Sequence, residues 1–245
     1  MHREHFYVNP RDVRGSELIL SEEETHHLLR VLRKKKGDIV WVVDGEGTGY
    51  EVKILHIETN GARGKILTTR RRIGEPVAEI HLAQGVLKGE RFDWLVEKAT
   101  EIGIRKIIPF TSENAVTVAG PQKVARWKRI AMAAMKQSGR SVLPEIASTM
   151  TFHQVVSLGS NCSCRLIAHI GPESVSVKSI ESKHHISTQR ALLVVGPEGG
   201  FSKEEMTRAV EHGFRPVTLG PRRLRAETAG IVFSTLVLSK LGELE

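Results

Sequence analysis

Short apolar runs separated by polar turns dominate the first 73 residues. They predict strands at residues 6–8, 18–20, 39–43 and 50–54. The Asp44-Gly45 step between the last two strands is typical of a hairpin turn. Ser21, followed three residues later by Glu24, predicts a capping box and a short helix that ends near Arg33. Short strands at this spacing predict a small β-barrel over residues 1–73.

From residue 74 onward, runs with strand periodicity alternate with runs of helical periodicity. Strands are predicted at residues 80–83, 104–110, 165–169, 191–195 and 217–219. Helices are predicted at residues 90–102, 121–138, 202–213 and 227–241. This alternation favours an α/β domain with a parallel sheet over residues 74–245. The last helix is apolar almost all round, which predicts burial on every side, by deep insertion or at an oligomer interface.

The composition is that of an ordinary globular protein, 40% hydrophobic and 26% charged. No apolar run reaches the roughly 18 residues of a membrane helix, and the N-terminus lacks the apolar core of a signal peptide. Two cysteines, Cys162 and Cys164, are too few for a disulfide framework. We therefore expect a reduced, cytoplasmic protein without membrane contact.

The chain is basic, with 36 lysines and arginines against 28 aspartates and glutamates and a net charge of +8. Such a balance suits polyanionic partners, although it also serves solubility. Clustering favours nucleic-acid phosphates over solubility alone. The clustered residues are Arg33, Lys34, Lys35 and Lys36, then Arg70, Arg71 and Arg72, and finally Arg222, Arg223 and Arg225.

The stretch VVGPEGGFSKEE, residues 194–205, places a glycine-rich loop between a strand and a helix. It lacks the lysine of a P-loop and the GxGxxG of a dinucleotide fold. Glu198 inside the loop would repel a polyphosphate, so a neutral or cationic ligand fits better. S-adenosylmethionine, with its positive sulfonium, is such a ligand. The alternative is a tight connector without a ligand.

A second stretch, LGPRRLRAETA at residues 219–229, also follows a predicted strand and precedes a helix. Both loops would lie at the carboxyl edge of one parallel sheet, where ligands bind in open α/β folds. The paired loops therefore favour a ligand site over two unrelated connectors.

These two stretches resemble the paired C-terminal motifs of the RsmE family, the 16S ribosomal RNA uracil-N3 methyltransferases of the SPOUT superfamily. The resemblance extends to KGERFDWLVEKATEIGI at 88–104, KQSGR at 136–140 and HHLLRVLRKKKGD at 26–38. It implies a PUA-like RNA-binding barrel over residues 1–73 and a methyltransferase domain with a trefoil knot over 74–245. It also implies a homodimer, with S-adenosylmethionine as cofactor and one uridine of small-subunit ribosomal RNA as target.

The resemblance also assigns a cofactor pocket by motif position. Its expected members are Gly196, Pro197, Glu198, Gly199, Gly200, Leu219, Gly220, Leu224, Ala226 and Thr228. His169, at the end of another strand, either lines this pocket or is a packed strand-end histidine.

Methylation of uracil N3 requires loss of its proton, so a base or a field that stabilises the anion is needed. Arg225 and Arg222 are expected to stabilise charge on the uracil oxygens. Glu198 or Glu227 is expected to accept the proton or to offset the sulfonium charge. The runs Arg33–Lys36 and Arg70–Arg72 are expected to hold RNA phosphates.

Three further features of the sequence are not expected to carry catalytic or metal-binding chemistry. Asn114 stands where many family members carry an arginine, so one RNA contact would be missing or supplied elsewhere. Cys162 and Cys164, with His169, His184 and His185, do not have the spacing of a zinc site, so no metal is expected. The tryptophans are expected in the core: Trp41, Trp94 and Trp127.

Two other functions stay open at this point. One is a related knotted methyltransferase that acts on transfer RNA or on a ribose 2′-hydroxyl. The other is a non-catalytic RNA-binding assembly factor.

Overall fold

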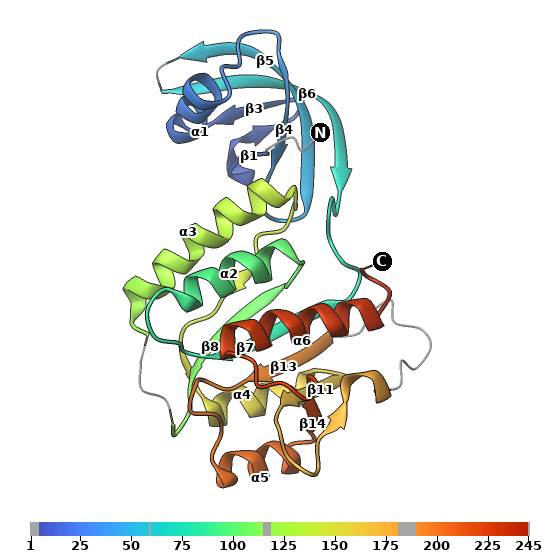
Figure 1. The fold of residues 1–245 in the computed structure, drawn as a ribbon. Helices are drawn as coiled ribbons and strands as arrows, with labels where there is room; N and C mark the ends of the chain where they lie inside the picture. The colour runs from blue at the N-terminus through green and yellow to red at the C-terminus, as the bar shows by residue number, and fades with distance from the viewer. Residues whose placement is uncertain (1–4, 59, 115–118, 181–189, 245) are drawn as a thin grey trace. The chain divides into compact units, whose positions relative to one another are not determined.

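A computed structural model describes residues 5–58, 60–114, 119–180 and 190–244. The chain forms two compact units (Figure 1). The first comprises Met1–Glu75 with Met132–Leu143, and the second comprises Pro76–Ala131 with Pro144–Glu245. The first unit is therefore built from two separate pieces of the sequence.

The first unit contains a six-stranded sheet in the order β1-β4-β5-β6-β3-β2. All its pairs are antiparallel except β1 with β4. The strands are β1 (Phe6–Tyr7), β2 (Val13–Arg14), β3 (Glu17–Leu20), β4 (Ile39–Val43), β5 (Thr48–Glu58) and β6 (Gly61–Arg71). Of the long β5–β6 hairpin, only part of β5 was predicted. Strand β6 ends in five consecutive exposed positions, so its sequence lacks the regular alternation of apolar and polar residues that indicates a strand.

Apolar side chains of alternating strand positions form the core of the first unit. This core joins Phe6, Leu18, Val42, Val52 and Ile54 with Leu28. Leu28 belongs to a helical segment made of α1 (Glu22–His26) and a π-helical turn (His27–Val31). The segment therefore covers the inner face of the sheet.

The capping box predicted at Ser21 is only half formed. The Ser21 side chain accepts from the Glu24 backbone N–H at 3.3 Å, which confirms the N-cap. The Glu24 carboxylate does not return to Ser21; it accepts from the Tyr7 N–H at 3.2 Å and from the Lys136 Nζ at 2.5 Å. The Glu24 carboxylate therefore bonds to residues distant in the sequence instead of to the Ser21 backbone N–H.

The KQSGR motif lies in the second sequence piece of the first unit. Its Arg140 is buried and donates from Nη2 to Glu75 Oε2 at 2.7 Å. The other Glu75 oxygen accepts the backbone N–H groups of Ser141 and Val142. Together with the Lys136–Glu24 pair, this ion pair fixes residues 132–143 against residues 1–75.

The second unit contains an eight-stranded parallel sheet in the order β10-β8-β7-β13-β11-β14-β12, with β9 paired to β8. Its strands are β7 (Glu79–Gly85), β8 (Lys106–Thr111), β9 (Glu145–Ile146), β10 (Met150–Thr151), β11 (Cys164–Ala168), β12 (Val175–Ser176), β13 (Arg190–Val195) and β14 (Arg215–Thr218). The five residues Ala191–Val195 are all buried, as expected for a strand covered on both faces.

Helices cover both faces of this sheet. Helices α2 (Arg91–Glu101) and α6 (Ala226–Lys240) lie on one face, and α4 (Phe152–Leu158) and α5 (Lys203–Glu211) lie on the other (Figure 1). Helix α3 (Pro121–Ser138) belongs to the second unit up to Ala131 and to the first unit beyond it. The mixed α/β fold with a parallel sheet confirms the predicted fold class.

Deep insertion of the last helix within the single chain was wrong, and its burial at an oligomer interface stays a prediction. One stripe of α6 is buried, through Gly230, Phe233, Val237 and Leu238. The opposite side carries Ala229, Ile231, Val232 and Leu236, and Leu236 is 37% exposed. The helix therefore presents an apolar side that the described residues bury only in part.

The tryptophans differ in burial. Trp127 lies in the core as predicted, and its indole N–H donates to Asp93 Oδ1 at 2.8 Å. Trp94 was expected in the core, but it is 43% exposed on α2 because its position falls outside the buried stripe of that helix. Among the described residues, no helix has the length and apolar character needed to span a membrane.

Candidate active site

The two glycine-rich loops follow neighbouring parts of the parallel sheet. Residues 196–202 follow β13, and residues 219–225 follow β14. Strand β11 lies between β13 and β14, and β7 lies on the other side of β13. Because all these pairs are parallel, both loops leave the same carboxyl edge of the sheet.

The end of β7 holds the first loop closely. A Cβ atom at Gly85 would lie 2.4 Å from the Pro197 nitrogen, so only glycine allows this approach. The buried Gln84 amide donates from Nε2 to the carbonyls of Gly196 at 3.2 Å and Val195 at 3.4 Å. The backbone of the loop is thus fixed before any ligand arrives.

The other side of the first loop rests on the segment after β8. The Asn114 Nδ2 donates to the Gly199 carbonyl at 3.3 Å. A Cβ at Gly199 would come within 2.9 Å of the Asn114 carbonyl oxygen. Asn114, singled out as a departure from the family pattern, thus supports the loop in this chain.

Helix α5 begins as predicted. Ser202 and Glu205 form a complete capping box, with both reciprocal bonds present. The Glu205 carboxylate also accepts the Glu113 N–H at 3.0 Å. The cap therefore joins the first loop to the segment after β8.

Two carboxylates of the loops meet one arginine. Arg91, the first residue of α2, donates from Nη1 to Glu198 Oε1 at 3.1 Å. Its Nε lies 4.0 Å from Glu227 Oε1. The Lys88 N–H also donates to Glu198, at 3.3 Å. The segment after β7 thus supplies the cation between the two predicted acidic residues.

One buried carboxylate oxygen at this edge lacks a hydrogen-bond partner among the described residues. Glu227 Oε2 accepts no hydrogen bond, and the residue is only 8% exposed. An unpaired buried polar atom costs stability, so this oxygen indicates a group that a ligand or water completes. The other unpaired buried atoms are spread over both units: His5 Nδ1, Thr25 Oγ1, Gln84 Oε1, Ser112 Oγ and Ser174 Oγ.

The second loop offers open backbone and unpaired arginines. Gly220 has a φ of +114°, and space lies open where its Cβ would stand. Gly200 in the first loop has the same openness at a φ of +69°. Arg222, Arg223 and Arg225 are exposed and make no ion pair with the described residues.

The remaining predicted cofactor residues surround these groups. Ala226 is buried, and Leu219, Leu224 and Thr228 are half-buried. His169 follows β11 and pairs its Nε2 with Glu173 Oε1 at 3.3 Å. The fold thus brings all the predicted cofactor positions to one edge of the sheet, and each position stays a prediction as a contact.

The residues at this edge fit a positively charged ligand, such as the S-adenosylmethionine that the family resemblance implies. Glu198 and Glu227 can balance a cation, while backbone carbonyls and N–H groups of the glycine loops can approach a base and a ribose closely. Sequence reasoning missed Arg91, Lys88 and Gln84. The signal for Lys88 and Arg91 was present in the KGERFDW motif, but a motif alone does not show which loop its charges meet, and Gln84 lies outside it.

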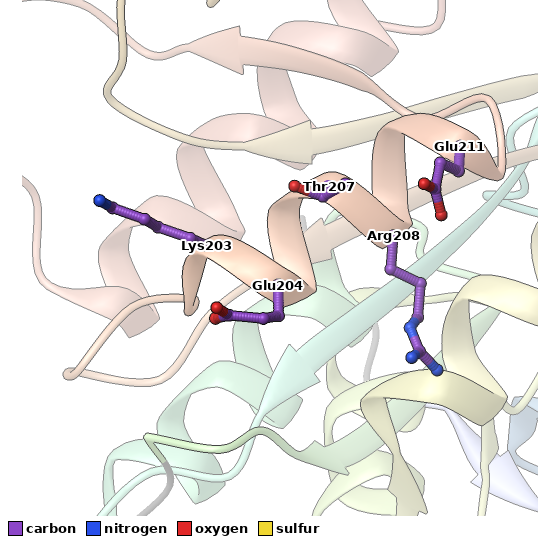
Figure 2. A pocket seen from close by; sticks show the side chains of 5 residues that line it. All are labelled: Lys203, Glu204, Thr207, Arg208 and Glu211. Atoms are coloured by element: carbon purple, nitrogen blue, oxygen red, sulfur yellow. The ribbon is translucent and has the colours of Figure 1, made fainter.

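A shallow hollow on α5 lies outside this arrangement (Figure 2). Its lining side chains all come from one helix: Lys203, Glu204, Thr207, Arg208 and Glu211. It includes none of the predicted site residues.

The described residues contain no group of three or more His, Cys, Asp or Glu side chains arranged to hold a metal. Burial raises the pKa of both thiols, Cys162 and Cys164, which makes them poor nucleophiles and ligands. His184 and His185 lie outside the described residues.

The two basic runs predicted to hold RNA phosphates lie in the first unit. Arg33, Lys35 and Lys36 are exposed, and Lys34 is half-buried. Arg70, Arg71 and Arg72 are exposed at the end of β6. The Arg70 guanidinium carbon lies 5.2 Å from the ring centroid of Trp41, which is half-buried rather than enclosed in the core.

Two family models match the chain. One, described as an RNA methyltransferase domain, matches residues 74–238. The other, described as an RNA methyltransferase PUA domain, matches residues 20–67. The chain therefore belongs to the family of RNA methyltransferases that combine these two domains, as the resemblance of its motifs predicted.

Comparison with individual proteins supports the same family. The ribosomal RNA small subunit methyltransferase E of Aquifex aeolicus is 32% identical over 237 residues, which cover 96% of this chain and 98% of the relative. The solved structure of the enzyme of that name from Neisseria gonorrhoeae, bound to S-adenosylmethionine, is 29% identical with a TM-score of 0.85. A Legionella pneumophila structure with bound S-adenosylmethionine is 28% identical, also with a TM-score of 0.85. Each structural match covers 98% of both chains.

Proposed function

We propose that this protein transfers a methyl group from S-adenosylmethionine to N3 of a uridine in 16S ribosomal RNA. The observation that carries this proposal is the edge where Glu198, Glu227 and Arg91 meet two glycine-rich loops with open backbone. Relatives over nearly the full chain are named for methylation of small-subunit ribosomal RNA, and two similar structures hold the same cofactor.

The cofactor, when bound, would supply the methyl group on its positive sulfonium. Gly196–Gly200 with Leu219 and Gly220 would hold it through the backbone, and Leu224, Ala226 and Thr228 would complete the pocket. His169 would line its rim. These assignments rest on the common edge and on motif position.

The two glutamates differ in their surroundings, which divides their proposed roles. Glu198 is ion-paired to Arg91 and half-exposed, so it suits a fixed counter-charge. Glu227 keeps one buried oxygen without a donor, so it is the better proton acceptor for uracil N3. Arg225 and Arg222, unpaired on the second loop, would stabilise the anionic uracil oxygens.

The expected quaternary structure is a homodimer. The apolar side of α6, through Ile231, Val232 and Leu236, favours contact with a second copy. The trefoil knot implied by the family resemblance would lie in the same domain. Sedimentation at several concentrations, with Leu236→Glu as the disrupting variant, tests the dimer.

A calorimetric titration with S-adenosylmethionine, with ATP as the control, tests the cofactor. Digestion of reacted 16S ribosomal RNA to nucleosides then tests the product, which should be 3-methyluridine. A 2′-O-methylated nucleoside, or transfer only to transfer RNA, would replace the proposed reaction by a related one. Cofactor binding without transfer to any of these RNAs would indicate an assembly factor instead.

Glutamine variants separate the two carboxylates. Glu227→Gln should lower kcat while the dissociation constant for S-adenosylmethionine changes little. Glu198→Gln should mainly weaken cofactor binding. The opposite pattern would exchange the two roles.

A further inference from the structure

The outer face of the sheet in the first unit carries basic side chains that the runs in the sequence do not include. On β5 and β6, the buried residues Val52, Ile54 and Ala62 alternate with exposed Lys53, Arg63 and Lys65. Because successive strand residues point to opposite faces, these three basic side chains share the outer face. We call Lys53, Arg63 and Lys65 the basic triad.

The register brings the two lysines together. Lys53 on β5 stands directly opposite Lys65 on β6. Side chains opposite each other in an antiparallel pair have Cβ atoms about 5 Å apart. Arg63 is two residues from Lys65 on the same strand. Three positive charges are therefore concentrated at one place on the sheet.

This concentration costs stability and is not explained by the fold. Like charges placed directly opposite each other destabilise a sheet. Lysines that protect a sheet edge against aggregation stand on edge strands, whereas β5 and β6 are interior strands of the order β1-β4-β5-β6-β3-β2. None of the triad forms an ion pair with a described residue, although Glu17 stands opposite Lys65.

The surroundings suit a polyanion with an apolar component. Exposed isoleucines stand opposite two members of the triad: Ile39 opposite Lys53 and Ile19 opposite Arg63. Glu17, Glu51 and Glu58 share this face with Arg14, Arg70 and the triad, so five basic side chains outnumber three acidic ones and its net charge is positive. Further along the face, Arg70 stacks on Trp41.

We propose that the basic triad on the outer face of this sheet binds the phosphate backbone of the RNA substrate. A phosphate between Lys53 and Lys65 removes their mutual repulsion, and the flanking isoleucines contact ribose or base. The identity of the RNA as 16S ribosomal RNA rests on the proposed function. The proposal that the triad binds phosphate rests on the strand register, the exposure of the three side chains and their charge.

The test measures binding of a full-length 16S ribosomal RNA transcript to the full chain at several salt concentrations. Each phosphate contact adds about 0.7–0.9 to the slope of log affinity against log salt. Lys53→Gln with Lys65→Gln should therefore reduce the slope by about 1.5 and weaken binding about tenfold at ~0.1 M salt. Lys53→Arg with Lys65→Arg should retain both values.

The matched control is Lys123→Gln with Lys128→Gln, which removes the same charge from an exposed side of α3. It should leave the slope nearly unchanged. Equal effects of the two double variants, or no effect of the triad variant, would overturn the proposal. Thermal unfolding adds a second readout: the triad variant should keep or raise the midpoint, because a repulsion is removed.

These outcomes are independent of the proposed reaction. If the transcript binds through the triad but no 3-methyluridine forms, the reaction is wrong and the surface stands. If S-adenosylmethionine titrates normally and 3-methyluridine forms, yet the triad variant binds RNA like the unmodified chain, the surface is wrong and the reaction stands.

Discussion

At the parallel sheet of the second unit, charged side chains near the strand ends pair with one another, as in Arg91–Glu198, Arg190–Glu79 and Lys106–Glu145. On the outer face of the first unit's sheet, Lys53 and Lys65 face each other, and neither forms an ion pair with a described residue, although Glu17 stands opposite Lys65. Of the pairs in the second unit, Arg91–Glu198 lies at the candidate site, and paired charges of this kind suit a prepared site for one small ligand. Unpaired basic charges suit a partner that brings its own negative charges.

The largest expected effect comes from the buried ion pair of the first unit. Arg140→Ala should lower the free energy of unfolding by about 3–5 kcal/mol, because it leaves Glu75 buried without its counter-charge. Chemical denaturation measures this. Arg126→Ala in the second unit breaks a half-exposed pair with Asp93 and should cost less than about 1 kcal/mol. Similar costs would remove the contrast between buried and exposed pairs.

The next effect concerns the approach of β7 to the first loop. Gly85→Ala should destabilise the protein by about 1–3 kcal/mol and weaken S-adenosylmethionine binding, because the new Cβ meets the Pro197 backbone at 2.4 Å. Calorimetry and thermal unfolding check both. Gly120→Ala, where nothing lies within 4 Å, is the control and should be neutral. An unperturbed Gly85 variant would show that the loop is not fixed in advance.

The sequence predicted the second unit better than the first. Continuous apolar runs such as residues 191–195 and capped helices such as α5 depend on local signals, and they were found within a residue or two. Strand β6 was missed because its outer positions carry charge, and because only its pairing with β5 in the folded chain identifies it as a strand. Nothing local shows that residues 132–143 pack with residues 1–75.

The loops of the candidate site could be predicted from the sequence, but the residues that contact those loops could not. Glycine, proline and capping residues identify a loop at a strand end from local chemistry. The contacts Arg91–Glu198 and Asn114–Gly199 join residues 107 and 85 positions apart, so only the fold brings them together. Pairing of Glu24 with Lys136 instead of Ser21 has the same cause.

A smaller effect sharpens the electrostatic contrast at the site. Arg91→Ala should lower affinity for S-adenosylmethionine about tenfold, or about 1.4 kcal/mol, because Glu198 loses the hydrogen bond that holds its carboxylate in position for the cofactor. Lys98→Ala on the same helix, which breaks only the pairs with Glu97 and Glu101, should leave affinity unchanged. Equal losses would point to a general effect of α2.

An effect of similar size concerns the opposite edge of the parallel sheet. Burial, helped by Arg190 and Lys106, lowers the pKa of His81 to about 4, against the opposing influence of Glu79 and Glu145. The unfolded chain therefore binds more protons between pH 6.5 and 4. The contribution of His81 to stability is present above pH 6.5 and is lost as the pH falls towards 4.

His81→Gln should remove this loss. Its unfolding free energy should fall less steeply between pH 6.5 and 4, by about 1–2 kcal/mol after allowance for the partial exposure of the ring. Parallel denaturation curves of the two proteins over this range measure the difference. Identical pH dependence would show that His81 is not held neutral.

The division of the first unit into two pieces of sequence has a consequence for its synthesis. Residues 1–75 leave the ribosome first, yet two of their buried carboxylates find their partners only in Met132–Leu143. Until then Glu24 lacks Lys136 and Glu75 lacks Arg140, so the early chain cannot complete its ion pairs. A gene fragment that ends at Glu75 encodes only part of a folding unit.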